Sequence, residues 1–225
     1  DLGSERSNCA VGDDAQGLLA AGQTGILSYG LDGERLDTGM RVFFASYAPP
    51  PRMLVFGAID FAAALARLGS FLGYRVTVCD ARAIFATPAR FPDAAEVVNA
   101  WPHRYLAEQL SKRLVDERTV LCVLTHDPKF DIPLLEVALS GSPVAFIGAM
   151  GSRRTHADRI ARLRHAGLGE AELSRLHSPV GLDLGARTPE ETAVSIAAEF
   201  IARQWNGTGV PLRQLGERIH HEEPR

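Results

Sequence analysis

Cysteine is scarce in this sequence, and the spacing of the few cysteines excludes two kinds of structure. Cys9, Cys79 and Cys122 are the only three, they lie far apart, and no Cys-x-x-Cys pair occurs. An odd and dispersed set argues against a disulfide framework and against a structural zinc site. We therefore expect a protein of a reducing compartment, the cytoplasm.

Long apolar runs and an excess of positive charge are also missing. The longest apolar stretch, residues 53–66, is interrupted by Asp60, and it is shorter than the ~20 residues of a membrane span. A formal charge of -3 gives no positive field to attract nucleic acid or anionic lipid. The start of the chain has no signal-peptide pattern, and Asp rather than Met at position 1 leaves the completeness of the N-terminus open.

The 225 residues, 46% of them hydrophobic, are enough for one large core and a small extra lobe. Three consecutive prolines, Pro49–Pro51, read as a linker between them. Before the linker, one helix-like and two strand-like stretches predict a small α+β lobe over residues 1–48. After it, residues 49–225 alternate apolar strands with amphipathic helices, which predicts a doubly wound, Rossmann-like parallel sheet.

Five stretches rich in β-branched and aromatic residues are the predicted strands: 52–57, 74–80, 95–101, 119–126 and 144–150. Helices are expected at 61–73, 153–167 and 188–205. The last begins with a capping box, in which Thr188 is the N-cap and Glu191 follows three residues later. If the strand order is 3-2-1-4-5, the ends of strands one, four and five share one edge, where such sheets bind ligands.

The first of these strand ends has part of a dinucleotide-binding pattern. Gly57 and Ala58 fall at the strand-to-helix turn, and Asp80, followed by Arg82, closes the next strand. Ile59, however, stands where a second glycine normally lets the backbone approach a pyrophosphate. Two interpretations stay open: Gly57 and Asp80 contact a nucleotide-like ligand, or the glycine serves packing and the aspartate caps its own loop.

The fourth and fifth strand ends also bring polar residues to this edge. His126 and Asp127 are candidates for proton transfer, although Asp127 can equally cap a helix. In IGAMGSRRTH, Gly148 and Gly151 permit a tight turn, Ser152 can cap the helix, and two arginines follow. Free amides and two guanidiniums suit a phosphate; the alternative is an exposed basic helix face. The cofactor-binding candidates are Gly57, Ala58, Asp80, Arg82, Gly148, Gly151, Ser152, Arg153, Arg154 and, in a glycine-rich loop, Asp183.

Several long strings, taken together, resemble the C-terminal Rossmann domain of the XdhC/CoxI family of xanthine dehydrogenase accessory proteins. The match covers about residues 52–204, through VFGAIDFAAALARLGSFLGYRVTVCDAR, FATPARFPDA, LTHDPKFDIPLL, IGAMGSRRTHADRIARL and SPVGLDLGARTPEETAVSIAAE. Residues 9–47 resemble the end of that family's N-terminal domain, in which Cys9 matches a cysteine and becomes the candidate metal ligand. A second cysteine expected before the linker is replaced by Asp37-Thr38-Gly39.

The resemblance implies a protein that binds molybdenum cofactor (molybdopterin), protects it during sulfuration and delivers it to a xanthine dehydrogenase-type apoenzyme. Turnover is not required for that role. The implied partners are the hydroxylase and a sulfurtransferase, and a homodimer is an option. The alternatives are an NAD(P)-dependent oxidoreductase, disfavoured by Ile59, and a Rossmann scaffold that serves only protein interaction.

Overall fold

The computed structural model describes residues 2–20, 22–35, 39–125, 127–141 and 144–216, and the chain divides into two compact units, residues 1–51 and 52–225. In the N-terminal unit, helix α1 (Glu5–Ala20) packs on an antiparallel pair of strands, β1 (Gly25–Tyr29) and β2 (Met40–Phe44). The buried Tyr29 hydroxyl donates a 2.8 Å hydrogen bond to Asp14, which joins sheet and helix. No described helix is long and apolar enough to cross a membrane.

The second unit, called here the Rossmann unit, contains a six-stranded, fully parallel sheet. Its strands lie in the order β5-β4-β3-β6-β7-β8, which confirms the predicted 3-2-1-4-5 order and adds one strand. The added strand has only two residues, too few to give an apolar pattern. The strands are β3 (Arg52–Phe56), β4 (Arg75–Asp80), β5 (Glu96–Asn99), β6 (Val120–Val123), β7 (Phe146–Ala149) and β8 (Leu176–His177).

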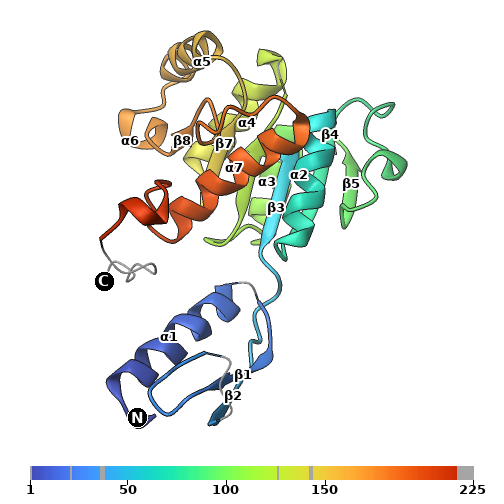
Figure 1. Ribbon diagram of the computed structural model, residues 1–225. Coiled ribbons are helices and arrows are strands. Elements are labelled where there is room, and N and C mark those ends of the chain that lie inside the picture. The colour runs from blue at the N-terminus through green and yellow to red at the C-terminus, as the bar shows by residue number, and fades with distance from the viewer. Residues whose placement is uncertain (1, 21, 36–38, 126, 142–143, 217–225) are drawn as a thin grey trace. The chain divides into compact units, whose positions relative to one another are not determined.

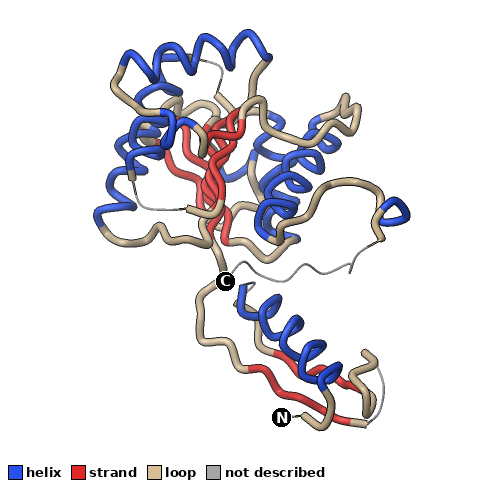
Figure 2. The backbone as a smooth tube through the Cα atoms, turned by 90° about the vertical axis from the view of Figure 1, so that its left-hand side faces the viewer, coloured by secondary structure: helices blue, strands red, loops and turns tan. Residues whose placement is uncertain are grey.

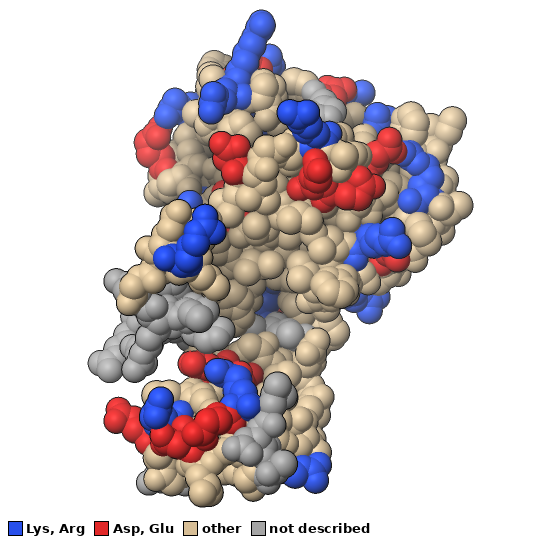
Figure 3. Space-filling model, viewed as in Figure 1, with Lys and Arg blue, Asp and Glu red and all other residues tan. Residues whose placement is uncertain are grey.

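Helices cover both faces of this sheet (Figures 1 and 2). Helices α2 and α7 pack side by side on one face, and Figure 3 shows their outer surface. Helices α3 to α6 belong to the other face. The bounds are α2 (Asp60–Phe71), α3 (Pro102–Ser111), α4 (Pro128–Ser140), α5 (Arg153–His165), α6 (Glu170–Leu173) and α7 (Pro189–Gln204), with short 3-10 helices at Pro88–Arg90 and Leu212–Gln214.

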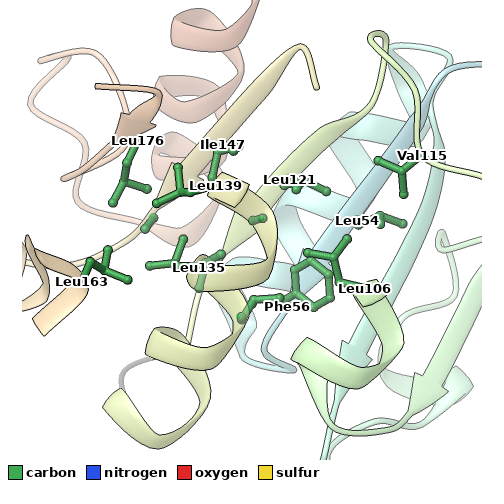
Figure 4. Close-up of a cluster of buried hydrophobic side chains, with 14 of the residues drawn as sticks. Leu54, Phe56, Leu106, Val115, Leu121, Leu135, Leu139, Ile147, Leu163 and Leu176 are labelled. Carbon is green, nitrogen blue, oxygen red and sulfur yellow. The ribbon is translucent and has the colours of Figure 1, made fainter. Parts of the chain in front are cut away.

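Successive side chains along each strand point to opposite faces of the sheet, so the hydrophobic core has two layers. Leu54 and Phe56 of β3 belong to the layer beneath α3 and α4, whereas Met53 and Val55 belong to the layer beneath α2 and α7. This is the period-2 pattern of a sheet that is buried on both faces. Figure 4 shows part of the first layer, where Leu54, Phe56 and Ile147 extend toward the α3 and α4 side.

The predicted capping box at the start of α7 is confirmed. The Thr188 hydroxyl accepts a hydrogen bond from the Glu191 amide, and the Glu191 carboxylate accepts one from the Thr188 amide. Reciprocal bonds of this kind satisfy two amides that a helix start otherwise leaves unpaired. The last long helix is therefore fixed at its first turn by its own sequence.

Candidate functional site

The candidate site lies at the carboxyl edge of the parallel sheet, where β3, β6 and β7 end side by side. Their pairing continues beyond the strands, because the Leu124 amide bonds to the Phe56 carbonyl at 2.8 Å and the Met150 amide to the Val123 carbonyl at 2.9 Å. Gly57 and Gly151, which follow the ends of β3 and β7, therefore lie at the same edge of the sheet, as predicted. His126, the third residue expected there, lies outside the described residues.

Gly57 is required for close packing between two strand ends. Its φ of +110° is one that L side chains rarely adopt. A Cβ atom at this position would lie 2.9 Å from Thr125 Cγ2 and 3.0 Å from the Thr125 amide nitrogen. The glycine therefore lets the β3 turn approach the end of β6, which is the packing interpretation; a ligand contact remains a prediction.

Asp80 caps its own loop. Its Oδ2 accepts hydrogen bonds from the Ala58 amide and from Arg82 Nη2, both at 2.7 Å. Its Oδ1 accepts hydrogen bonds from the Arg82 amide at 2.9 Å and from Arg82 Nε at 3.0 Å. Burial disfavours the charged carboxylate, but the hydrogen bonds from Arg82 and Ala58 outweigh it and hold the pKa of Asp80 below its usual value. With 2% of its surface exposed, this carboxylate serves its own loop, and its predicted contact with a cofactor stays a prediction.

Two arginines lie over one aromatic ring beside the same turn. The guanidinium carbons of Arg82 and Arg90 are 4.7 Å and 5.6 Å from the centre of the Phe85 ring. Arg90 also donates to the Ala58 carbonyl at 3.1 Å and forms a 3.2 Å ion pair with Asp60. Arg90 therefore offsets the negative charge at the start of α2. No sequence pattern singles it out, since its contacts come from loop geometry.

Asp127 is the N-cap of α4, where its Oδ1 accepts the Lys129 amide at 2.9 Å. Its side chain is exposed at the sheet edge. The charge of Asp127 reaches Arg82: the pKa of Arg82 is raised mainly by its hydrogen bond to Asp80 and secondarily by the charges of Asp80 and Asp127. The Lys129 ammonium lies 5.1 Å from the centre of the Trp101 ring. Asp127 is thus a structural cap, and its predicted role in proton transfer stays a prediction.

The β7 end differs in one respect from expectation. Gly148 does not form the turn: it is buried inside β7, where a Cβ atom would lie 2.5 Å from Val180 and 2.6 Å from the Phe146 ring. Its role in the structure is packing between strand and loop. The turn belongs to Gly151, with φ +151°, and Ser152 caps α5 as predicted, because its hydroxyl accepts the Thr155 amide at 3.1 Å.

Arg153 and Arg154 are exposed in the first turn of α5. Within the part of the chain that the structure describes, neither their side chains nor their backbone amides have a hydrogen-bond or ion-pair partner. Two cations and two unpaired amides at a helix N-terminus form an arrangement that attracts anions. The structure brings these groups to the predicted edge, and both the phosphate interpretation and the exposed-face interpretation remain.

A buried ion pair, missed in the sequence, holds this edge together. Arg159 of α5 is 3% exposed, and its Nη2 lies 2.8 Å from Asp131 Oδ2 of α4. The same guanidinium donates to the Met150 carbonyl at 3.0 Å and to the Ser178 hydroxyl at 2.8 Å, while Asp131 accepts from Thr125. We call Thr125, Asp131 and Arg159 the buried triad. Arg159 lies four residues before the inward-facing Leu163, a spacing that places both on one helix face.

The glycine-rich loop before α7 is fixed by a second carboxylate. Glu199 lies 3.0 Å from His177 Nδ1 and accepts the Gly181 amide at 2.6 Å. Burial disfavours its charged form, but these hydrogen bonds outweigh it and lower the pKa of Glu199 below its usual value. Asp183, the predicted residue of this loop, is exposed and has no hydrogen bond or ion pair to another described residue.

The cysteines do not form a metal centre in the described parts of the chain. Cys9 is an exposed free thiol in α1, and the described residues include no group of three or more His, Cys, Asp or Glu side chains arranged to hold an ion. Asp37 and Thr38 lie outside the described residues. Burial raises the pKa of the Cys79 and Cys122 thiols to about 12, so neither is a nucleophile near neutral pH.

Comparison with known proteins gives consistent matches. The family model for the XdhC Rossmann domain matches residues 53–200. "Uncharacterized protein YqeB" of Escherichia coli is 30% identical over 80% of this chain and 32% of its own length. A probable xanthine dehydrogenase subunit of Bacillus subtilis is 33% identical over 73% and 46%, and "Molybdenum cofactor insertion chaperone PaoD" of E. coli is 27% identical over 73% and 44%.

A solved structure shares the fold. The structure described as a xanthine dehydrogenase from Bacillus halodurans is 25% identical, with a TM-score of 0.59, and the match covers 84% of this chain and 62% of that one. This chain spans less than half the length of the three curated relatives named in the preceding paragraph. Because the XdhC Rossmann-domain model covers well over half of the sequence and the sheet has the expected strand order, the chain belongs to the XdhC family.

Proposed function

We propose that this protein handles molybdenum cofactor for a xanthine dehydrogenase-type hydroxylase. It binds the cofactor while a sulfurtransferase installs the terminal sulfur, and it then delivers the cofactor to the hydroxylase apoenzyme. Two kinds of support point this way. The names of two relatives refer to xanthine dehydrogenase and to molybdenum cofactor insertion. At the sheet edge, Arg153 and Arg154 and their amides have no partner among the described residues.

The start of α5 is the observation that carries the proposal. Molybdenum cofactor has a phosphate group, and phosphate needs hydrogen-bond donors and positive charge. Arg153 and Arg154, with the two adjacent amides, offer both on the exposed first turn of a helix whose Ser152 cap leaves them free. The residues present therefore fit an anionic group. Gly57, Asp127 and the loop with Asp183 are candidates for contacts with the rest of the molecule.

The turn after β3 does not fit a pyrophosphate equally well. The Ala58 amide is already bonded to Asp80, and both Asp80 oxygens accept hydrogen bonds from Ala58 or Arg82. Ile59 is the N-cap of α2 and packs partly against the core. A dinucleotide would have to displace these bonds, so we propose that the Rossmann unit serves cofactor handling rather than NAD(P)-dependent oxidoreduction.

The test replaces both arginines of the first α5 turn. Each charge-assisted hydrogen bond contributes about 1.5 to 3 kcal/mol, so Arg153→Ala/Arg154→Ala should bind molybdenum cofactor at least ~10-fold more weakly. The matched control, Arg162→Ala/Arg164→Ala, removes the same charge from the other end of the helix and should bind nearly as wild type. Both variants should fold, because all four side chains are exposed.

Calorimetric titration with cofactor and a thermal melt are the two measurements. A selective loss of affinity in the first variant supports a phosphate site at the start of α5. Equal affinities for wild type and both variants, with unchanged melting temperatures, would reduce Arg153 and Arg154 to an exposed helix face.

A further inference from the structure

An aromatic surface lies at the carboxyl edge of the sheet, where β5 ends and α4 begins. Trp101 follows the last residue of β5 by two positions, and it is 37% exposed. The centre of its ring lies 5.4 Å from that of Phe130, in the first turn of α4, and 6.0 Å from that of His103. The neighbouring rings hold the indole in place, and a fixed, partly exposed indole offers a large flat face to a ligand.

A cation and a carboxylate lie at the start of α4, beside this ring. The Lys129 ammonium is 5.1 Å from the centre of the Trp101 ring and 5.6 Å from that of Phe130. Asp127, two residues earlier, is exposed, and only its Oδ1 is used for the helix cap. Across the residues that the structure describes, neither the Lys129 ammonium nor Asp127 Oδ2 has a hydrogen-bond or ion-pair partner. The surface therefore offers a flat ring, a positive donor and a negative acceptor.

The edge of a pterin ring matches these groups chemically. A pterin carries an amino group and a ring N–H side by side, followed by a carbonyl oxygen. A carboxylate accepts hydrogen bonds from two adjacent donors, as it does from a guanidinium, and an ammonium donates to a carbonyl oxygen. Adenine lacks this order of two donors and one acceptor. The charged pair therefore favours a pterin over an adenine, and the indole suits the face of either ring.

We propose that Trp101, Asp127 and Lys129, called here the ring subsite, bind the pterin ring of the cofactor. This inference rests on the proposed function and extends it, because the start of α5 accounts only for the phosphate. The first turn of α4 connects the two places: Lys129 lies over Trp101, and Asp131 pairs with Arg159 of α5 at 2.8 Å. The ring subsite and the phosphate site thus flank one helix start, at a separation on the order of one helix diameter, ~10–12 Å. Such an arrangement suits a ligand with a ring at one end and a phosphate at the other.

A phosphate-free pterin tests the ring subsite separately from the phosphate site. In calorimetric titration, wild type should bind 6-hydroxymethylpterin, and Arg153→Ala/Arg154→Ala should bind it equally well because this ligand has no phosphate. Trp101→Leu should bind it at least ~10-fold more weakly, whereas Trp101→Phe, which keeps an aromatic face, should lose less. The chain has one other tryptophan, so Trp205→Phe is the matched control and should bind as wild type.

The charged pair supplies an arm that does not depend on stacking. Asp127→Asn keeps a side chain that caps a helix but loses the negative acceptor, and Lys129→Met keeps the apolar stem without the ammonium. Each variant should bind the pterin at least ~10-fold more weakly, because a charge-assisted hydrogen bond is lost. Both side chains are exposed, so a thermal melt should change little. Adenosine should not compete with the pterin, whereas guanosine, which has the same amino, N–H and carbonyl edge, should compete weakly.

The outcomes separate this inference from the proposed function. No pterin binding by wild type at millimolar concentration, an unchanged affinity in Trp101→Leu, or an equal loss in Trp205→Phe would overturn the ring subsite. Tighter binding of guanosine than of pterin would also overturn it, because the surface would then belong to a nucleotide. If Trp101→Leu does not fold, Asp127→Asn and Lys129→Met decide. The phosphate site is judged independently, by the affinity of the double arginine variant for the intact cofactor.

Discussion

Gly57→Ala is the substitution that most directly tests how the sheet edge is built. A non-glycine residue held at a sparsely populated backbone conformation costs about 1 to 3 kcal/mol, and the φ of Gly57 is +110°. The added methyl would also meet Thr125 Cγ2 at 2.9 Å, the Thr125 nitrogen at 3.0 Å and the Leu124 carbonyl carbon at 3.1 Å. Overpacking of this kind adds about 1 to 3 kcal/mol to the cost.

The matched control is Gly167→Ala. Gly167 has a similar φ of +99°, but a Cβ atom there would meet nothing within 4 Å. The control variant therefore has the cost of the unfavourable backbone conformation without the steric contact of the added methyl group. We expect Gly57→Ala to lower the free energy of unfolding by about 2 to 6 kcal/mol and Gly167→Ala by about 1 to 3 kcal/mol.

Urea unfolding followed by far-ultraviolet circular dichroism measures the difference, and a thermal melt checks it. At about 2 to 4 °C per kcal/mol for a protein of this size, the extra loss at Gly57 should appear as a melting temperature roughly 2 to 12 °C below that of the control. If the two variants are equally stable, Thr125 does not constrain the turn, and the packing interpretation of Gly57 is refuted.

Three further predictions concern the candidate site. Arg159→Met should destabilise the fold by about 3 to 5 kcal/mol in urea unfolding, because it leaves Asp131 charged and buried. The double variant Arg159→Met/Asp131→Leu should recover much of this loss. A double variant as unstable as the single one would contradict this. Asp80 binds protons more weakly in the folded chain than in the unfolded one, so stability should fall as the pH drops below about 4, and Asp80→Asn should flatten that part of the pH profile. Fluorescence titration should give no tight NADH binding, because the Ala58 amide and Asp80 are occupied; a low-micromolar dissociation constant would show that they rearrange.

The strands and their order were predictable because they depend on local patterns and on a general rule. Met53–Phe56 is a continuous apolar run, and Val76–Cys79 is apolar except for the buried Thr77, as expected of strands buried on both faces. The last helix carries its own start signal at Thr188. By contrast, β8 has two residues, and its pairing with β7 depends on tertiary packing rather than on any periodicity.

The contacts of the candidate site were less predictable, because they join residues that are distant in the sequence. Asp131 and Arg159 are 28 residues apart, and no local pattern says that this arginine, among several on α5, is the buried one. Gly148 was predicted to form a turn, but the strand extends one residue past it, and sequence patterns locate element ends only approximately. For Asp80, the sequence left two interpretations open, and the structure favours the loop cap through hydrogen bonds that only coordinates show.

The buried triad has a consequence for how a ligand meets the start of α5. Arg159 anchors the helix to α4, to the end of β7 and to the loop after β8, about one and a half turns from the two exposed arginines. If an anion binds there, as we propose, it meets backbone amides already held in position, and binding would restrict little more than two arginine side chains. Affinity would then be gained by avoiding the entropic loss of ordering a loop, and the rigidity of the proposed binding surface would be set by a buried ion pair beneath it.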